Sequence, residues 1–228
     1  MLAPLEKYNT DADTIYAVLD LLYRIKLNFL NHLPQINQFP LGIKATWNQA
    51  AQYNIPNQQL ADWLLHTGSL TERLQALTHN FEVRVLGQAT IDADESEQAA
   101  LVDYDKHDWQ IREVILYGNG KPWVFARSVL PEHLCKTTWA TLGNQPLGQR
   151  IFNDDNFVRS EFVITQLASN PIASIEDGPL TEHETEVLWG RRSAFQIKDW
   201  HLLVAEIFLP DCPSYISESA DSLNSSVK

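Results

Sequence analysis

The sequence predicts an α+β domain: a single six-stranded antiparallel sheet with helices packed on it. The clearest observation is a β-hairpin in which residues 109–117 and 121–130 flank a glycine-rich turn at 118–120. A second hairpin is expected in residues 188–210, which close the domain. Strands joined by hairpins are antiparallel, and no alternation of strand and helix runs along the chain, so a parallel sheet is disfavoured.

Periodicity places the other elements. Alternating apolar residues predict strands at 81–87 and 159–167, and the closing hairpin turns at residues 198–199. Apolar residues at helical spacing predict a helical pair in 57–77, and Ser69 with Glu72 fits a capping box at the break between its two helices. A shorter helix is expected at residues 131–143, and a short turn or helix at 146–152.

The chain is expected to divide into three parts. Residues 1–56 form an N-terminal extension with an amphipathic helix at 13–30, residues 57–210 form the main domain, and residues 211–228 are a polar tail. Within the main domain, the acidic insertion at 91–108 is interpreted as a solvated loop with a short helix.

Composition excludes several classes of function. The 228 residues carry a net charge of -12, so the long-range field of the protein repels nucleic acid and anionic membranes. Two cysteines without a metal or disulfide pattern, and no secretory signal, favour the cytoplasm. No stretch is apolar enough for stable membrane insertion, the seven histidines lack metal-ligand spacing, and a monomer is the default expectation.

Three ionisable residues lie on apolar faces of the predicted strands, namely Arg112, Arg127 and Glu206. A charge buried in a core is costly unless it is paired or functional, so we expect all three to face one shared cavity. Two arginines against one carboxylate favour a pocket for a small organic acid; the alternative is a structural ion pair. Arg191 and Arg192 are interpreted as a solvated strand start.

Four stretches of the sequence resemble the chorismate pyruvate-lyase family. They are DWLLHTGSLTERL (62–74), REVILYGNGKPWVFARSVLP (112–131), LGNQPLGQRIF (142–152) and LWGRRSAFQIKDWHLLVAEIFLP (188–210). The resemblance implies a chorismate lyase-like sheet with an enclosed ligand site under two helical flaps. It also implies a lyase that converts chorismate to 4-hydroxybenzoate and pyruvate without a metal or organic cofactor, the first committed step of ubiquinone biosynthesis.

The resemblance also implies roles for five residues. By motif position, Arg112 binds the ring carboxylate and Glu206 meets the ring hydroxyl. Leu70 and Leu147 contribute backbone contacts, and Arg127 serves the enolpyruvyl carboxylate or the exit path. Arg112 and Glu206 are therefore the candidate catalytic residues, with Glu206 moving the ring proton or donating one to the leaving group.

Three other functions remain open at this stage. A non-catalytic module of the same fold would bind a small aromatic acid and leave it unchanged. A different chorismate-using enzyme would release another product. A purely structural α+β protein would use the buried charges as ion pairs.

Overall fold

The computed structural model describes residues 39–101, 104–106, 108–140, 142–143, 145–152, 156–168 and 187–215. The predicted helix at 13–30 and the tail beyond residue 215 lie outside the described residues.

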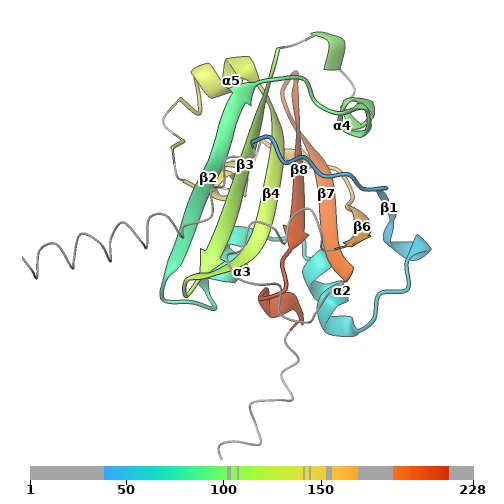
Figure 1. Cartoon of the computed structure of the whole chain (residues 1–228). Coiled ribbons are helices and arrows are strands. Elements are labelled where there is room, and N and C mark those ends of the chain that lie inside the picture. The colour runs from blue at the N-terminus through green and yellow to red at the C-terminus, as the bar shows by residue number, and fades with distance from the viewer. Residues whose placement is uncertain are drawn as a thin grey trace, which may run out of the picture.

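Eight strands form one sheet in which every pairing is antiparallel (Figure 1). The strands run in the order β1-β6-β7-β8-β4-β3-β2, and β5 also pairs with β7. Their bounds are β1 Asn48–Gln49, β2 Phe81–Thr90, β3 Trp109–Gly118, β4 Lys121–Pro131, β5 Val158–Arg159, β6 Val163–Ala168, β7 Val187–Ile197 and β8 Trp200–Phe208. The α+β class and the antiparallel sheet are confirmed.

The predicted number of six strands was wrong. Strands β1 and β5 are each two residues long, which is too short for apolar residues to show an alternation. The single strand predicted at 159–167 is two strands, β5 and β6, and both pair with β7. Short edge pieces of this kind are defined by the strand they pair with, so the sequence pattern does not reveal them.

Both predicted hairpins are present. In the first turn Asn119 and Gly120 have φ angles of 52° and 79°, as the favoured two-residue hairpin turns require. In the second turn Lys198 has a φ of 52°. The second hairpin is in regular register from Ile197 opposite Trp200 to Gly190 opposite Ile207.

The helices are short. Their bounds are α2 Gln58–Leu64, α3 Leu70–Gln75, α4 Glu95–Ala100, α5 Glu132–Lys136 and α6 Leu147–Phe152, with 3-10 turns at 50–52, 104–106 and 213–215. The Ser69 hydroxyl accepts a hydrogen bond from the Glu72 N–H at 3.3 Å and so caps α3, which confirms the Ser69 half of the predicted capping box. None of the helices among the described residues has the length and apolarity that crossing a membrane requires.

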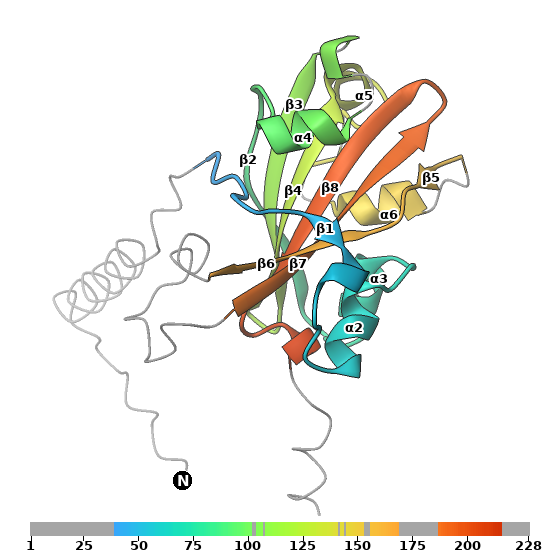
Figure 2. The same ribbon diagram turned by 90° about the vertical axis from the view of Figure 1, so that its right-hand side faces the viewer.

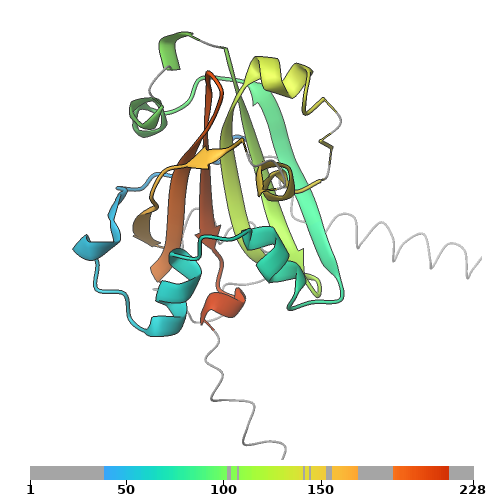
Figure 3. The same ribbon diagram turned by 180° about the vertical axis from the view of Figure 1, so that it is seen from behind.

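The two faces of the sheet are covered differently (Figures 2 and 3). Helices α2 and α3 pack on one face through Leu60, Trp63, Leu70 and Leu74, and α6 adds Leu147 and Ile151. On the opposite face lie residues 39–47 and the segment around α4. The face under α3 and α6 carries the pocket described below.

The acidic insertion is not simply solvated. Asp94 and Glu97 form a capping box at the start of α4, yet the Glu97 side chain is only 6% exposed. It accepts two hydrogen bonds from Arg127, at 2.6 and 2.9 Å. The interpretation of this stretch as a solvated loop was therefore wrong for Glu97, because a buried arginine on the sheet draws the carboxylate inward.

Candidate active site

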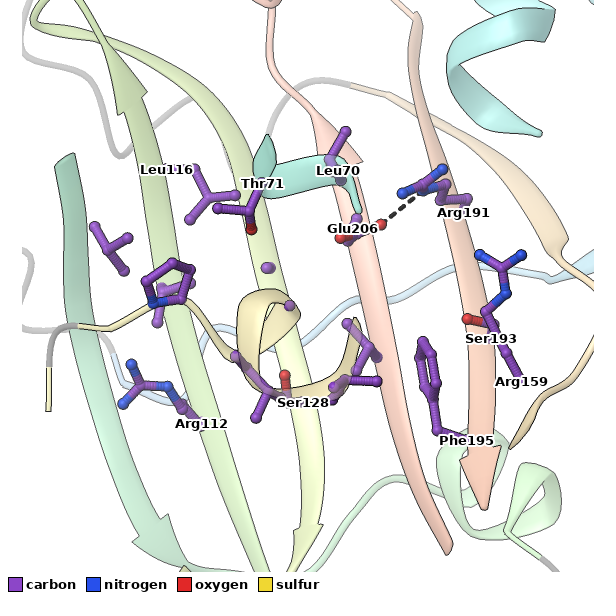
Figure 4. Close-up of a pocket in the computed structure, with 18 of the residues that line it drawn as sticks. Leu70, Thr71, Arg112, Leu116, Ser128, Arg159, Arg191, Ser193, Phe195 and Glu206 are labelled. Atoms are coloured by element: carbon purple, nitrogen blue, oxygen red, sulfur yellow. Dashed lines mark hydrogen bonds and ion pairs between the residues drawn. The ribbon is translucent and has the colours of Figure 1, made fainter. Parts of the chain in front are cut away.

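A pocket lies between the sheet and helices α3 and α6 (Figure 4). Strands β2, β3, β4, β7 and β8 form its floor, and Leu70, Thr71, Leu147 and Gly148 cover it. Its empty volume, including the opening to solvent, is about 670 Å³.

The strand pattern explains which side chains reach the pocket. Successive side chains of a strand point to opposite faces, and the even-numbered residues of β3 and β8 face the helices. Arg112 therefore lines the pocket beside Val114 and Leu116, and Glu206 lines it beside Val204. The prediction that Arg112 and Glu206 share one cavity with Leu70 and Leu147 agrees with this placement.

Arg112 is held at one end of the pocket. Its guanidinium donates to the Gln88 Oε1 at 3.0 Å and to the Gly143 carbonyl at 2.8 Å. Among the described residues, no carboxylate forms an ion pair with it. Burial lowers the pKa of Arg112 below its ordinary value. A buried cation held only by neutral groups is suited to binding an anion.

Glu206 lies at the other end, paired with an arginine from the neighbouring strand. Arg191 Nε donates to Glu206 Oε2 at 2.6 Å (Figure 4). Arg191 Nη1 donates to the carbonyls of Trp63 and His66, at 3.1 and 2.9 Å. Because Trp63 belongs to α2 and His66 to the segment that leads from α2 to α3, Arg191 connects the carboxylate to the helical pair that covers the pocket. The hydrogen bonds among the described residues use only Oε2 of Glu206.

A third arginine lines the same end. Arg159 of β5 packs its guanidinium 4.3 Å from the centre of the Phe162 ring, and Arg191 lies 4.5 Å from the same ring. Burial lowers the pKa of Arg159, and the neighbouring charge of Arg191 lowers it further. The phenyl ring and two guanidinium groups thus form a cationic cluster beside Glu206.

The prediction that Arg127 faces the same cavity was wrong. Arg127 lies on the opposite face of the sheet, where it pairs with Glu113 at 2.7 Å and with Glu97 at 2.6 Å. The physical reason is a β-bulge: the register between β3 and β4 shifts at Leu116 and Tyr117. An unbroken hairpin would place Arg127 opposite Arg112, but the extra residue places it opposite Glu113 and turns it to the other face.

The interpretation of Arg191 and Arg192 as a solvated strand start was also wrong. They are 2% and 8% exposed, on opposite faces of β7. Arg191 was missed as a site residue although the sequence held a signal for it. The predicted turn at 198–199 sets the hairpin register, and that register places Arg191 directly opposite Glu206.

The cover of the pocket consists of two helices that touch each other. The Gln149 Nε2 on α6 donates to the Gln75 Oε1 on α3 at 3.0 Å. A Cβ at Gly148 would lie 3.0 Å from the Thr71 Oγ1, so this glycine permits the close approach. The described residues contain no cluster of three or more His, Cys, Asp or Glu side chains placed to bind a metal ion.

Comparison with known proteins supplies the family. The chorismate lyase family model matches residues 41–218. The chain belongs to the chorismate lyase family. It is 43% identical to a protein of Pseudoalteromonas atlantica named "Probable chorismate pyruvate-lyase", over 80% of this chain and 95% of that one. A protein of the same name from Shewanella amazonensis is 38% identical over 78% of this chain and 94% of its own length.

Among solved structures, the PhnF protein of Mycobacterium smegmatis is similar to this chain with a TM-score of 0.46 and 18% identity. The similarity covers 64% of this chain and 66% of that one. The family match confirms the resemblance stated from the four sequence stretches. It also supports the predicted class of enzyme, a lyase.

Proposed function

We propose that this member of the chorismate lyase family converts chorismate to 4-hydroxybenzoate and pyruvate. The observation that carries the proposal is the pocket itself, with the Arg112 guanidinium at one end and the Arg191–Glu206 pair at the other. Chorismate is a dianion with a ring carboxylate para to a hydroxyl group. A cation facing a hydrogen-bond acceptor across an apolar floor is complementary to that substrate.

The reaction requires little from the protein beyond positioning and charge stabilisation. The C3–O bond of chorismate breaks, and its electron pair leaves on the enolpyruvate oxygen. The C4–H electron pair becomes part of the ring π system, and the proton lost from C4 is balanced by protonation of enolpyruvate to pyruvate. Because the ring becomes aromatic, the reaction is strongly downhill. Orientation of the substrate and stabilisation of the departing anion are then the main catalytic effects.

Arg112 is assigned to the ring carboxylate. Its backbone-carbonyl partners leave its positive charge uncancelled among the described residues, and its guanidinium can bind a carboxylate through two parallel hydrogen bonds. Leu70 and Leu147 are the first residues of α3 and α6. Backbone N–H groups at the start of a helix have no acceptor within it, so these two are suited to the predicted backbone contacts.

Glu206 is assigned to the ring hydroxyl. Arg191 holds the carboxylate through Oε2, and Oε1 is directed to the substrate in this proposal. In this position Glu206 moves the ring proton or donates one to the leaving group. Helices α3 and α6 act as flaps, because opening their contact uncovers the part of the pocket that holds the ring.

The pathway, the oligomeric state and the cellular location of the enzyme are part of the same proposal. The reaction is the first committed step of ubiquinone biosynthesis, and the enzyme works as a monomer in the cytoplasm. The acidic net charge of -12 supports a reaction on a small metabolite rather than on nucleic acid.

The decisive experiment incubates the purified full-length protein with chorismate and separates the products by chromatography. The expected result is 4-hydroxybenzoate and pyruvate in equal amounts, with an Arg112→Gln variant as the matched inactive control. Binding of chorismate without any product would instead support the non-catalytic aromatic acid-binding module. A different aromatic product would identify another chorismate-using enzyme.

A further inference from the structure

The substrate of the proposed reaction has a second carboxylate, on its enolpyruvyl group, and that carboxylate needs a partner. The family resemblance implied Arg127 for this carboxylate or for the exit path, but Arg127 lies on the other face of the sheet with Glu97 and Glu113. Among the described residues that line the pocket there are three arginines and one carboxylate. Arg112 is assigned to the ring carboxylate, so the second partner is Arg159 or Arg191.

Arg191 is already committed. Its Nε donates to Glu206 at 2.6 Å, and its Nη1 donates to two backbone carbonyls. Turning it toward a substrate carboxylate would break a buried ion pair and leave Glu206 without its cation. Arg191 is therefore a positioning residue for Glu206, and the second carboxylate requires another group.

Arg159 has the required position. It lies on the side of the pocket away from Arg112, beside Arg191 and Ser193 (Figure 4). It is half-buried, and it also lines a more open hollow next to the pocket, so it lies at the mouth. Its guanidinium packs against Phe162, which restricts its orientation.

We propose that Arg159 binds the enolpyruvyl carboxylate of the substrate, at the mouth of the pocket. This assignment rests on the proposed lyase function and deepens it. Ring and side chain of the substrate are then held by different arginines, Arg112 inside and Arg159 at the opening. When the C3–O bond breaks, the electron pair that leaves on oxygen develops beside the cationic cluster of Arg159 and Arg191, which stabilises it.

The electrostatics of the cluster agree with a bound anion. Burial and the adjacent Arg191 lower the pKa of Arg159, and the Glu206 carboxylate raises it. A substrate carboxylate beside Arg159 and Arg191 would act in the same direction as Glu206 and favour the charged guanidinium. After cleavage the group held by Arg159 departs as pyruvate on the solvent side, while 4-hydroxybenzoate remains on Arg112.

The two carboxylates give a sharp test, because only one of them survives in the aromatic product. Arg159→Gln is expected to lower kcat/KM for chorismate at least about tenfold, the effect of losing a charge-assisted hydrogen bond. Its Kd for 4-hydroxybenzoate should stay within about twofold of the wild-type value. The matched control Arg112→Gln should weaken both chorismate turnover and 4-hydroxybenzoate binding, and Arg159→Lys should recover part of the loss.

Two results would overturn the proposal. One is an Arg159→Gln variant that loses 4-hydroxybenzoate affinity as strongly as chorismate turnover, which would indicate a structural role. The other is an unchanged kcat/KM. To separate this from failure of the lyase function itself, chorismate binding is also measured with Arg159→Gln in a Glu206→Gln background. If wild-type protein forms no product but Arg159→Gln still weakens chorismate binding selectively, the lyase function fails and the Arg159 site stands.

Discussion

At the scale of single residues, Arg112 and Arg127 lie on neighbouring strands but on opposite faces of the sheet. Arg112 meets the pocket, whereas Arg127 joins Glu97 and Glu113 in an ion cluster whose members are at most 4% exposed. The Leu41 and Gly42 N–H groups donate to the Glu113 carboxylate at 2.8 and 2.9 Å. The cluster therefore ties α4, the sheet and the chain at residues 41–42 together.

Arg127→Ala should destabilise the fold and leave ligand binding intact. The substitution leaves two buried carboxylates without their cation, which costs about 3–5 kcal/mol in the free energy of unfolding. Urea unfolding measures that loss, and titration with 4-hydroxybenzoate at low temperature measures affinity. Arg112→Ala is the control: it should lose affinity for 4-hydroxybenzoate and lose less unfolding free energy than Arg127→Ala. If the Arg127→Ala protein folds but binds 4-hydroxybenzoate much more weakly, Arg127 contributes to the ligand site after all.

Glu206→Gln should reduce turnover and preserve the fold. The amide keeps the shape of the side chain but cannot exchange a proton, and it loses the ion pair with Arg191. We expect kcat to fall by about 100-fold, a typical contribution of general acid–base catalysis. The kcat of the variant is measured with chorismate as the substrate, and thermal unfolding checks that the variant is folded. Near-full turnover would rule out both proton roles for Glu206.

At the scale of elements, helices α3 and α6 form the cover of the pocket. Each is six residues long, and on its own a helix of that length is not stable in water. They are held by apolar contacts to the sheet and by their own contact at Gly148, Thr71 and the Gln75–Gln149 hydrogen bond. Such a small contact suits a cover that opens for each catalytic cycle.

Gly148→Ala should loosen this cover. The new methyl group would lie 3.0 Å from the Thr71 Oγ1, so Thr71 or its helix must shift by a few tenths of an ångström. We expect the Kd for 4-hydroxybenzoate to rise about threefold to tenfold, equivalent to roughly 1 kcal/mol. The double variant with Thr71→Ala removes the clash and should restore affinity. If Gly148→Ala alone binds the product as tightly as wild type, the contact does not control the cover.

At the scale of the whole molecule, two buried thiols link stability to pH. Burial raises the pKa of the Cys212 thiol from 9.0 to about 11, and burial does the same for Cys135. Below pH 9 both thiols are protonated in the folded and unfolded chains, so they add no pH dependence. Between pH 9 and about 11 only the unfolded chain releases these protons, and unfolding becomes more favourable.

The free energy of unfolding should therefore fall as the pH rises from about 9 to 11. For Cys212 the loss is up to about 2.7 kcal/mol, from a shift of about two pKa units. Denaturant unfolding at several pH values measures the slope. A Cys212→Ala variant, compared by its slope rather than by its absolute stability, should show a smaller fall. If both proteins show the same slope, the pH dependence does not come from the Cys212 thiol.

The sequence by itself determined the hairpins, the cap at Ser69 and the faces of Arg112 and Glu206. Each of these follows from local rules: turn residues set the hairpin, and side chains alternate along a strand. The four family stretches, confirmed by the match over residues 41–218, also determined the enzyme class. These local signals placed two of the three charged residues correctly.

The tertiary structure alone decided the rest of the site. One bulged residue in β4 reverses the face of Arg127, and no local pattern marks where the register shifts. Burial of Glu97 depends on that arginine, far away in sequence, and Arg159 reaches the pocket because β5 pairs with β7. Alternation is a property of a single strand, whereas register, burial and the pairing of short strands depend on partners that only the folded chain brings together.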